Sequence, residues 1–354
     1  MYLTGMTGNL LLYGANGYTG RLILEYAERY GLSPILAGRN ESAIRELSSQ
    51  YDLPYRTGSL TNADEMDNLL KDVSVVLHVA GPFSETARPM VEACLRNSIH
   101  YLDITGEIPV FEYARSLDGK ARGAGIMVMP GTGFDVVPTD CMAKRLRDQL
   151  SDATHLELAF TSIGGGISHG TATTMARSLG EGGAIRSNGK IISDPLGNHS
   201  RHIDFGKGPQ LVMSIPWGDV STAYHTTGIP NIIVYTGIPP RIHQILKLQK
   251  LYNWALRTGW ARKKAQQWID KKPAGPSPET RSNSRSYVWG QVRNSQGSSS
   301  TAMLTCADGY TLTAHSSLII AKKVLDGNFS PGYQTPAGCY GSGLIDEIPG
   351  SAWL

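Results

Sequence analysis

The sequence predicts an α/β protein: a Rossmann-type, doubly wound parallel sheet followed by a second α+β domain on a mixed or antiparallel sheet. Three observations predict it. Over the first 130 residues, short and almost continuously apolar strands alternate with helical segments, which is typical of a parallel sheet covered on both faces. After Pro138 this rhythm stops, and strands of alternating polarity appear. The chain has 354 residues, enough for two domains of ordinary size.

The elements of the first domain follow in order along residues 1–135. Strands are predicted at 10–13, 34–37, 73–79, 101–104 and 126–129. Helices are predicted at 19–30, 41–51, 64–70, 88–96 and 111–117, from apolar residues at helical spacing. This order of elements builds successive strand–helix–strand units.

The second domain, residues 136–330, has a different composition of elements. Strands are predicted at 155–163, 211–215, 223–227, 232–235, 287–292 and 302–305. Helices are predicted at 143–150, 171–179 and 314–325, with one long helical segment at 241–272 and a last helix at 336–347. The mixture predicts an α+β domain.

Composition excludes several classes of protein. With 41% hydrophobic and 18% charged residues, the chain is globular rather than disordered. A net charge of +3 argues against a dedicated nucleic-acid binder. The four cysteines lie at least 33 residues apart and His199 and His202 have no third ligand in register, so no metal site is predicted. Without a signal peptide or an 18-residue apolar run, we expect a cytoplasmic protein.

A glycine-rich loop joins the first predicted strand to the first predicted helix. It contains Gly14, Ala15, Asn16, Gly17, Tyr18, Thr19 and Gly20. Gly14 permits a tight turn, Gly17 allows close approach of a pyrophosphate, and Gly20 allows the helix to pack on the strand. The helix N-terminus then faces the phosphate charge. Between a strand and a helix, this spacing predicts a dinucleotide site.

The second strand ends at Arg39, where an NAD-preferring fold places an acidic residue for the ribose 2′-hydroxyl. An arginine there is suited to a 2′-phosphate. The alternative is a surface arginine at the end of the sheet. We therefore predict NADP as the cofactor.

Three further loops follow predicted strands, at the sheet edge where such folds bind ligands. They are 80–83, 103–107 and 130–140. The first contains Ala80, Gly81, Pro82 and Phe83, and the second contains Asp103 and Gly106, all predicted to contact the cofactor. For Asp103 and Asp140, local hydrogen bonding within the loop is the alternative.

The motifs of these loops resemble the saccharopine dehydrogenase-like oxidoreductases, and most closely their trans-acting enoyl reductase branch. They are YGANGYTG at 13–20, AGR at 37–39, AGPF at 80–83, YLDITGE at 101–107 and GFDVVPTD at 133–140. The segment from 335 to 343 resembles the C-terminal helix of that branch, which implies that residues 331–354 return to the first domain. The resemblance implies NADP-dependent reduction of a C=C or C=N bond. Residues 180–300 match no family pattern.

The proton donor is open at this stage. The Tyr-x-x-x-Lys pair of short-chain dehydrogenases is absent from the sequence. Asp135 and His169 are the catalytic candidates, and Tyr101 is a further polar candidate. When a hydride adds to the β-carbon of an enoyl substrate, the enolate oxygen needs donors and water can protonate the α-carbon.

A competing motif lies at residues 166–170, where Gly-Ile-Ser-His-Gly fits the nucleophile elbow of α/β-hydrolases. Ser168 would be its nucleophile, with an acid and a histidine downstream. Gly164 and Gly165 lengthen what should be a sharp turn. A glycine-rich loop beside the substrate is the other interpretation.

The basic segment, residues 241–272, holds nine Lys or Arg residues and one acid, Asp270. It carries +8, so the rest of the chain sums to −5. With Trp254, Trp260 and Trp268 it resembles a helix that lies on an anionic membrane surface or docks an acyl carrier protein. The alternative is a solvated charged face with an apolar face toward the core.

We therefore predict an NADPH-dependent oxidoreductase that reduces the C=C bond of an enoyl or lipid-type acyl substrate, with a homodimer as a possible assembly. Two alternatives remain: imine reduction on an amino acid, and a non-catalytic NADP-binding protein at a membrane or lipid surface.

Overall fold

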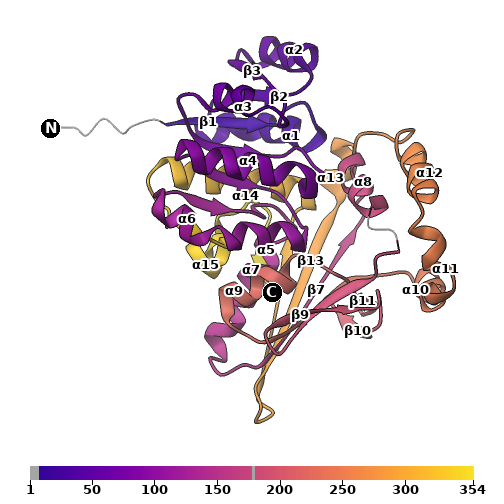
Figure 1. Ribbon diagram of the computed structural model, residues 1–354. Coiled ribbons are helices and arrows are strands. Elements are labelled where there is room, and N and C mark those ends of the chain that lie inside the picture. Colours follow the sequence, from indigo (N-terminus) through magenta and orange to yellow (C-terminus); the bar gives the residue numbers. More distant parts are fainter. Residues whose placement is uncertain (1–7, 178–179) are drawn as a thin grey trace. The chain divides into compact units, whose positions relative to one another are not determined.

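The computed structural model describes residues 8–177 and 180–354, which form two compact units (Figure 1). The first unit comprises the described residues up to Val137 together with Tyr310–Cys339, and the second comprises Pro138–Gly309 and Tyr340–Leu354. The sequence-based boundaries differ near the C-terminus. Residues 310–330 belong to the first unit because they continue into a strand of its sheet, and residues 340–354 belong to the second because they end in a strand of the other sheet.

The first unit contains a seven-stranded parallel sheet, in the order β3-β2-β1-β4-β5-β6-β15. The strands are β1 (Asn9–Tyr13), β2 (Ile35–Gly38), β3 (Tyr55–Thr57), β4 (Val73–His78), β5 (His100–Asp103), β6 (Met127–Met129) and β15 (Gly332–Tyr333). The five predicted strands are confirmed, and the two short edge strands β3 and β15 were not predicted. The strand order reverses at β1 and β4, the place where doubly wound sheets bind ligands.

The helices of the first unit connect these parallel strands. They are α1 (Tyr18–Ala27), α2 (Glu41–Tyr51), α3 (Ala63–Leu70), α4 (Phe83–Asn97), α5 (Ile108–Ser116), α6 (Asp118–Gly123) and α14 (Gly309–Leu325). A further helix, α15 (Pro336–Tyr340), begins in this unit and ends at the first residue of the second unit's C-terminal segment. α4 begins five residues before the predicted helix and holds Pro89 in its second turn. α7 (Val137–Gln149), which belongs to the second unit from Pro138 onward, begins six residues before the predicted helix. Pro138 lies in its first turn, where a missing N–H costs nothing.

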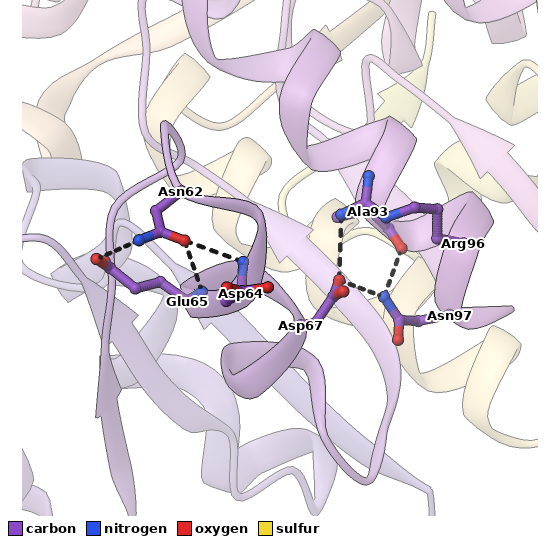
Figure 2. Close-up of polar contacts among 7 residues, drawn as sticks. All are labelled: Asn62, Asp64, Glu65, Asp67, Ala93, Arg96 and Asn97. Atoms are coloured by element: carbon purple, nitrogen blue, oxygen red, sulfur yellow. Dashed lines mark hydrogen bonds and ion pairs between the residues drawn. The ribbon is translucent and has the colours of Figure 1, made fainter.

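Polar side chains fix the position of α3 (Figure 2). Asn62 is its N-cap and accepts from the backbone N–H groups of Asp64 and Glu65 at 3.0 and 3.3 Å. Asp67, the fifth residue of the helix, accepts from Arg96 Nη2 at 3.1 Å and Asn97 Nδ2 at 2.9 Å, both at the C-terminal end of α4. The cap defines the start of the helix, and the Asp67 contacts join it to its neighbour.

The core of the first unit lies beneath the strands of its sheet. Tyr13, Val76, Tyr101 and Val128 come from four neighbouring strands and are at most 1% exposed. The inner strands are almost entirely buried, as in β2, where all four residues are buried, whereas the edge strand β3 has no buried residue. Burial on both faces explains the continuous apolar runs that predicted a parallel sheet.

The second unit contains a nine-stranded mixed sheet. Its strands are β7 (His155–Ile163), β8 (Gly183–Ser187), β9 (Lys190–Asp194), β10 (Ser200–Asp204), β11 (Pro209–Ser214), β12 (Asn231–Gly237), β13 (Arg285–Arg293), β14 (Ser299–Cys306) and β16 (Ala352–Trp353). β7 lies at the centre, parallel to β12 and antiparallel along its whole length to β13. The mixed sheet confirms the predicted fold class.

Two element predictions in the second unit are wrong. Residues 223–227 form a helix rather than a strand: α9 (Asp219–Thr227) packs on β12 and ends at Gly228, whose φ is +72°. The basic segment is not one helix but three, α10 (Pro240–Lys247), α11 (Gln249–Leu256) and α12 (Gly259–Ile269). The chain breaks at Leu248, which has a non-helical conformation, and at Thr258, which caps α12.

The other helices of the second unit are short. α8 (His169–Arg177) and α13 (Pro278–Asn283) flank the strands, and residues 178–179 of the predicted helix 171–179 lie outside the described residues. The predicted last helix at 336–347 is divided into α15 and a 3₁₀ turn at Ser342–Glu347. Over the described ranges, none of the helices is long and apolar enough to span a membrane.

Candidate functional site

The loop after β1 lies very close to the beginning of the loop that follows β4. The backbone of Gly14 has a φ of +94°, and a Cβ atom there would lie 2.8 Å from Ala80 N. Gly14 N donates to Ala37 O at 2.8 Å, which ties the loop to the end of β2. Gly20, in the first turn of α1, lies so close to the loop that a Cβ atom would be 2.4 Å from Gly14 O. A side chain at either glycine would force the loop out of this path.

The N-terminus of α1 carries no capping side chain. Its N-cap is Gly17, which is exposed, and its first turn, containing Tyr18 and Thr19, has no acidic residue. The N–H groups at the start of a helix are otherwise satisfied by caps or ligands. This end of α1 is therefore suited to an anion. Asn16 and Ala15 complete the turn, and Arg21 Nε donates to Asn16 O at 3.3 Å.

Arg39 directly follows β2 and is exposed. Within the described residues, no hydrogen bond or ion pair engages its guanidinium. The next residue, Asn40, caps α2 by accepting from Ala43 N at 3.1 Å. The arginine therefore stands beside a second helix N-terminus, and both favour a negatively charged group.

The loop after β4 contains Ala80, Gly81, Pro82 and Phe83, the last of which begins α4. Thr86 holds the loop, since its Oγ1 lies 2.7 Å from Ala80 O and 3.0 Å from His78 Nε2. Burial lowers the pKa of His78 to about 3, so this imidazole is neutral and has a structural position beneath the loop.

Asp103 is completely buried at the end of β5. Its carboxylate accepts from Tyr101 Oη at 2.7 Å and from the backbone N–H groups of Thr105 and Gly131, both at 2.9 Å. Burial raises its pKa to about 6, against the lowering effect of these three donors. The hydrogen bonds of Asp103 join two loops of the protein, in agreement with the loop-bonding alternative for this residue. Cofactor contact by Asp103 stays a prediction.

Glu107 is a functional candidate that the sequence analysis did not select. Its two carboxylate oxygens accept from Phe83 N at 2.9 Å and from Ser84 N at 3.0 Å, so it caps α4 across 24 residues of sequence. Pro82, the N-cap of that helix, has no side-chain oxygen to do this. An acid after a strand, combined with an uncapped helix start at the same sheet edge, was the signal available in the sequence.

Asp135 lies in the loop after β6, against the loop after β5. A Cβ atom added at Gly106 would be 2.5 Å from Asp135 Oδ2. Within the described part of the chain, this carboxyl group has no hydrogen bond or ion pair. Burial raises its pKa to about 7, and the charge of Glu107 adds to the rise. The group therefore exchanges a proton near neutral pH, as a general acid does.

His169 belongs to the second unit, as the first residue of α8. Its Nε2 lies 3.1 Å from Asp270 Oδ1, and its backbone N–H donates to Ala274 O at 2.8 Å. These contacts join α8 to the end of α12. Each of the two catalytic candidates, Asp135 and His169, is thus described within its own unit, and both remain predictions.

The structure gives Ser168 a role other than that of a hydrolase nucleophile. Ser168 immediately precedes α8, and its Oγ accepts from Thr171 N at 3.2 Å, which is the geometry of an N-cap. Five residues separate the end of β7 from the start of α8, unlike the sharp strand-to-helix turn of a nucleophile elbow. The described residues also contain no cluster of three metal-ligating side chains.

The first unit fits a dinucleotide with a 2′-phosphate on three observations. Glycines allow close approach at the loop after β1, the start of α1 has no side-chain cap, and Arg39 has no described partner. All of them lie at the carboxyl edge of the parallel sheet, beside the reversal of strand order. The residues of this edge can therefore hold NADP.

Comparison with known proteins agrees with this assignment. The model of the saccharopine dehydrogenase NADP binding domain family matches residues 10–129. The chain is 30% identical over 202 residues to a Mycobacterium tuberculosis protein named for trans-acting enoyl reductase activity, covering 53% of this chain and 48% of that protein. It is 27% identical over 178 residues to a saccharopine dehydrogenase-like oxidoreductase of Bos taurus, covering 45% and 42%. The chain thus matches about half the length of these relatives.

Among solved structures, apo saccharopine dehydrogenase (L-Glu forming) from Saccharomyces cerevisiae shares the fold. It matches with a TM-score of 0.67 and 14% identity, over 98% of this chain and 100% of that chain. At this identity the match concerns the fold and not the substrate. It confirms the combination of a Rossmann-type sheet with a second, mixed sheet.

Proposed function

Since residues 10–129 match the model of the saccharopine dehydrogenase NADP binding domain family, we propose that this chain is an NADPH-dependent reductase acting on the C=C bond of an enoyl or lipid-type acyl group. The observation that carries the proposal is the position of Asp135. It places a carboxyl group that titrates near pH 7 at the same sheet edge as the dinucleotide loop.

The residues of the first unit have separate parts in binding the cofactor. The turn from Gly14 to Gly20 and the N-terminus of α1 hold the pyrophosphate. Arg39 pairs with the 2′-phosphate, which distinguishes NADPH from NADH. The loop 80–83 lies beside Gly14 and bounds the site on the β4 side. When bound, NADPH supplies a hydride.

Reduction of an enoyl group also consumes one proton. As the β-carbon receives the hydride, the former double-bond electrons form an enolate, and the α-carbon then takes a proton. Asp135 in its protonated form donates this proton and is left as a carboxylate, which solvent reprotonates. Burial and the Glu107 charge keep a large share of Asp135 protonated at neutral pH. His169 is the second candidate donor.

A C=C substrate is favoured because the Mycobacterium tuberculosis relative is named for enoyl reduction. Imine reduction on an amino acid, the reaction type of the saccharopine dehydrogenases, is the alternative that the experiment must separate.

The test follows NADPH absorbance at 340 nm with purified protein. Enoyl thioesters of several chain lengths are one substrate set, and 2-oxo acids mixed with amino acids are the other. Oxidation of NADPH with the enoyl set, and formation of the saturated thioester by mass spectrometry, supports the proposal. Oxidation with the second set alone replaces it by imine reduction. Binding of NADPH without turnover of either set identifies a non-catalytic NADP-binding protein.

A further inference from the structure

Exposed apolar side chains are concentrated in the basic segment. Eleven large hydrophobic residues are exposed among those described, and six of them lie within 27 consecutive positions. These six are Ile242, Ile245, Leu248, Trp254, Trp260 and Trp268, between 49% and 72% exposed. Single exposed apolar residues need no explanation, but a concentration of this kind marks an interaction site.

In α12 the two tryptophans, Trp260 and Trp268, lie on the solvent-exposed side of the helix and do not pack in the core. The side facing inward carries small or polar residues, with Ile269 buried at 5% exposure, and α12 packs on α8. Gln266 Nε2 donates to Thr173 Oγ1 at 3.2 Å and Asp270 contacts His169 at 3.1 Å, which fixes the helix on α8. Ile269 lies toward the core, as a solvated charged face with an apolar inner side requires, but Trp260 and Trp268 lie on the exposed side and are not accounted for in that way.

The outward face of α12 combines apolar rings with positive charge. Trp260, Lys264 and Trp268 follow one another at a spacing of four residues, and Lys263 and Gln267 lie beside them; all five are exposed. Positions separated by three and four residues share one side of a helix. Just beyond the helix, Lys272 Nζ lies 4.4 Å from the centre of the Trp268 ring.

α10 has an outward face of the same character. Ile242, Ile245 and Leu248 are three residues apart in sequence and 49%, 60% and 58% exposed, with the exposed Arg241 beside them. His243, on the opposite side, is buried at 6% exposure. α10, α11 and α12 contact one another in succession along the edge of the second unit (Figure 1).

We propose that these outward faces dock on the surface of an anionic phospholipid bilayer. Indole rings favour the boundary between headgroups and acyl chains, because they present an apolar body and a polar N–H group. The isoleucine and leucine side chains enter the same boundary, while Lys263, Lys264 and Lys272 pair with headgroup phosphates. Such a helix lies in the interface and does not cross it.

The charge of the basic segment decides between the occupants. A second copy of this chain docking by the same face would bring Lys263, Lys264 and Lys272 against the same positive charges, which opposes association. An acidic carrier protein would pair with the lysines, but it leaves three exposed indole rings without the depth of apolar contact that a bilayer offers. A negatively charged membrane satisfies both the charge and the apolar side chains.

This surface does not depend on which bond the enzyme reduces. The experiment measures co-sedimentation of the full chain with vesicles of phosphatidylcholine containing 30% phosphatidylglycerol, and with pure phosphatidylcholine vesicles. The test variant is Lys263→Glu/Lys264→Glu. The matched control is Lys190→Glu/Lys207→Glu, which makes the same charge change at two exposed positions of the same unit outside the basic segment.

Binding to the anionic vesicles at low salt is expected, with at least about a 30-fold loss for the test variant, because each lysine contributes about 1 kcal/mol near such a surface. The control variant should bind within about threefold of the unchanged protein. Tryptophan emission gives a second readout: it should shift to the blue on binding, and the shift should be smaller in Trp260→Phe/Trp268→Phe, where Trp254 is the exposed indole that is left on this surface.

Three results overturn the proposal. One is equal loss in the test and control variants, which would show a non-specific charge effect. Another is no binding to anionic vesicles while an acidic acyl carrier protein does bind, which would assign the surface to that protein. The third is a concentration-dependent dimer in sedimentation equilibrium that the lysine substitutions strengthen, which would assign it to a second copy.

Discussion

The carboxyl group of Asp135 lies directly against the backbone of Gly106, at a distance that leaves no room for a Cβ atom. Oδ2 of Asp135 would be 2.5 Å from that atom. Because Gly106 has no side chain, it leaves room for the carboxyl group of Asp135, the candidate acid. Its contribution is tested by the smallest possible substitution.

Gly106→Ala should displace the Asp135 side chain and lower kcat for the reductase reaction. Overpacking of this kind also costs about 1–3 kcal/mol of stability. The matched control is Gly119→Ala, where a Cβ atom meets nothing within 4 Å. Steady-state kinetics and urea unfolding of both variants measure the two effects. Equal kcat in Gly106→Ala and the control would contradict the role of this contact.

Asp135→Asn should remove a pH dependence from both activity and stability. The pKa of this group is raised in the folded protein to about 7 from an ordinary value near 4. The folded state therefore binds the proton more tightly, and the stability that this gives is lost as pH rises from about 4 to about 7. Relative to the wild type, the variant should gain at least about 2 °C in Tm between pH 4.5 and 7.5.

In the kinetic measurement, wild-type kcat should fall as pH rises through about 7, because the donor loses its proton. The Asp135→Asn variant should have a low and flat profile. If the Asp135→Asn variant kept the wild-type pH profile, the proton donor would be His169 or water and not Asp135.

Arg39→Ala should weaken NADPH binding by about tenfold to a hundredfold, the effect of removing a charged hydrogen-bond partner. NADH binding should not change, because NADH has no 2′-phosphate. Arg29→Ala is the matched control, at another exposed arginine of the first unit. Nicotinamide fluorescence titrations of both variants measure the affinities. A parallel loss for NADPH and NADH would show that Arg39 does not select the cofactor.

Tyr101→Phe should destabilise the first unit by about 1–3 kcal/mol, because Asp103 loses one of its three donors while it stays buried. The Tyr101 hydrogen bond lowers the pKa of Asp103, so the variant's Asp103 pKa should rise above about 6. The loss should therefore be larger at pH 8, where the carboxylate is charged, than at pH 5. Urea unfolding at both pH values measures it, and an equal loss at both would contradict this explanation.

The sequence was sufficient to predict the five inner strands of the first sheet, because they are almost entirely buried and read as continuous apolar runs; the short edge strands β3 and β15 lack such a run. It also located the loops at one edge, since carboxyl ends of parallel strands share an edge. The contact between Gly106 and Asp135 was not predictable, because it joins two loops that come together only when β5 and β6 pair. The capping of α4 by Glu107 had a signal in the sequence, an acid and an uncapped helix start at the same sheet edge, but the pairing itself depends on tertiary structure.

The second unit was predicted less well for a physical reason. α9 is short and buried, with β-branched and aromatic residues, and such segments favour a strand until their packing is known. In α12 the spacing of the tryptophans indicated one face of a helix but not its direction. Only the packing of Ile269 and Gln266 toward α8 shows that this face points outward.

The carboxylate of Asp103 joins two loops by hydrogen bonds. One oxygen, Oδ1, receives N–H groups from both the loop after β5 and the loop after β6. Those loops contain Gly106 and Asp135. The distance between the two residues is therefore set by Asp103, which is buried and does not need to touch substrate. The two loops should consequently open and close as one unit in hydrogen exchange, and any motion that admits substrate there must carry Gly106 and Asp135 along together.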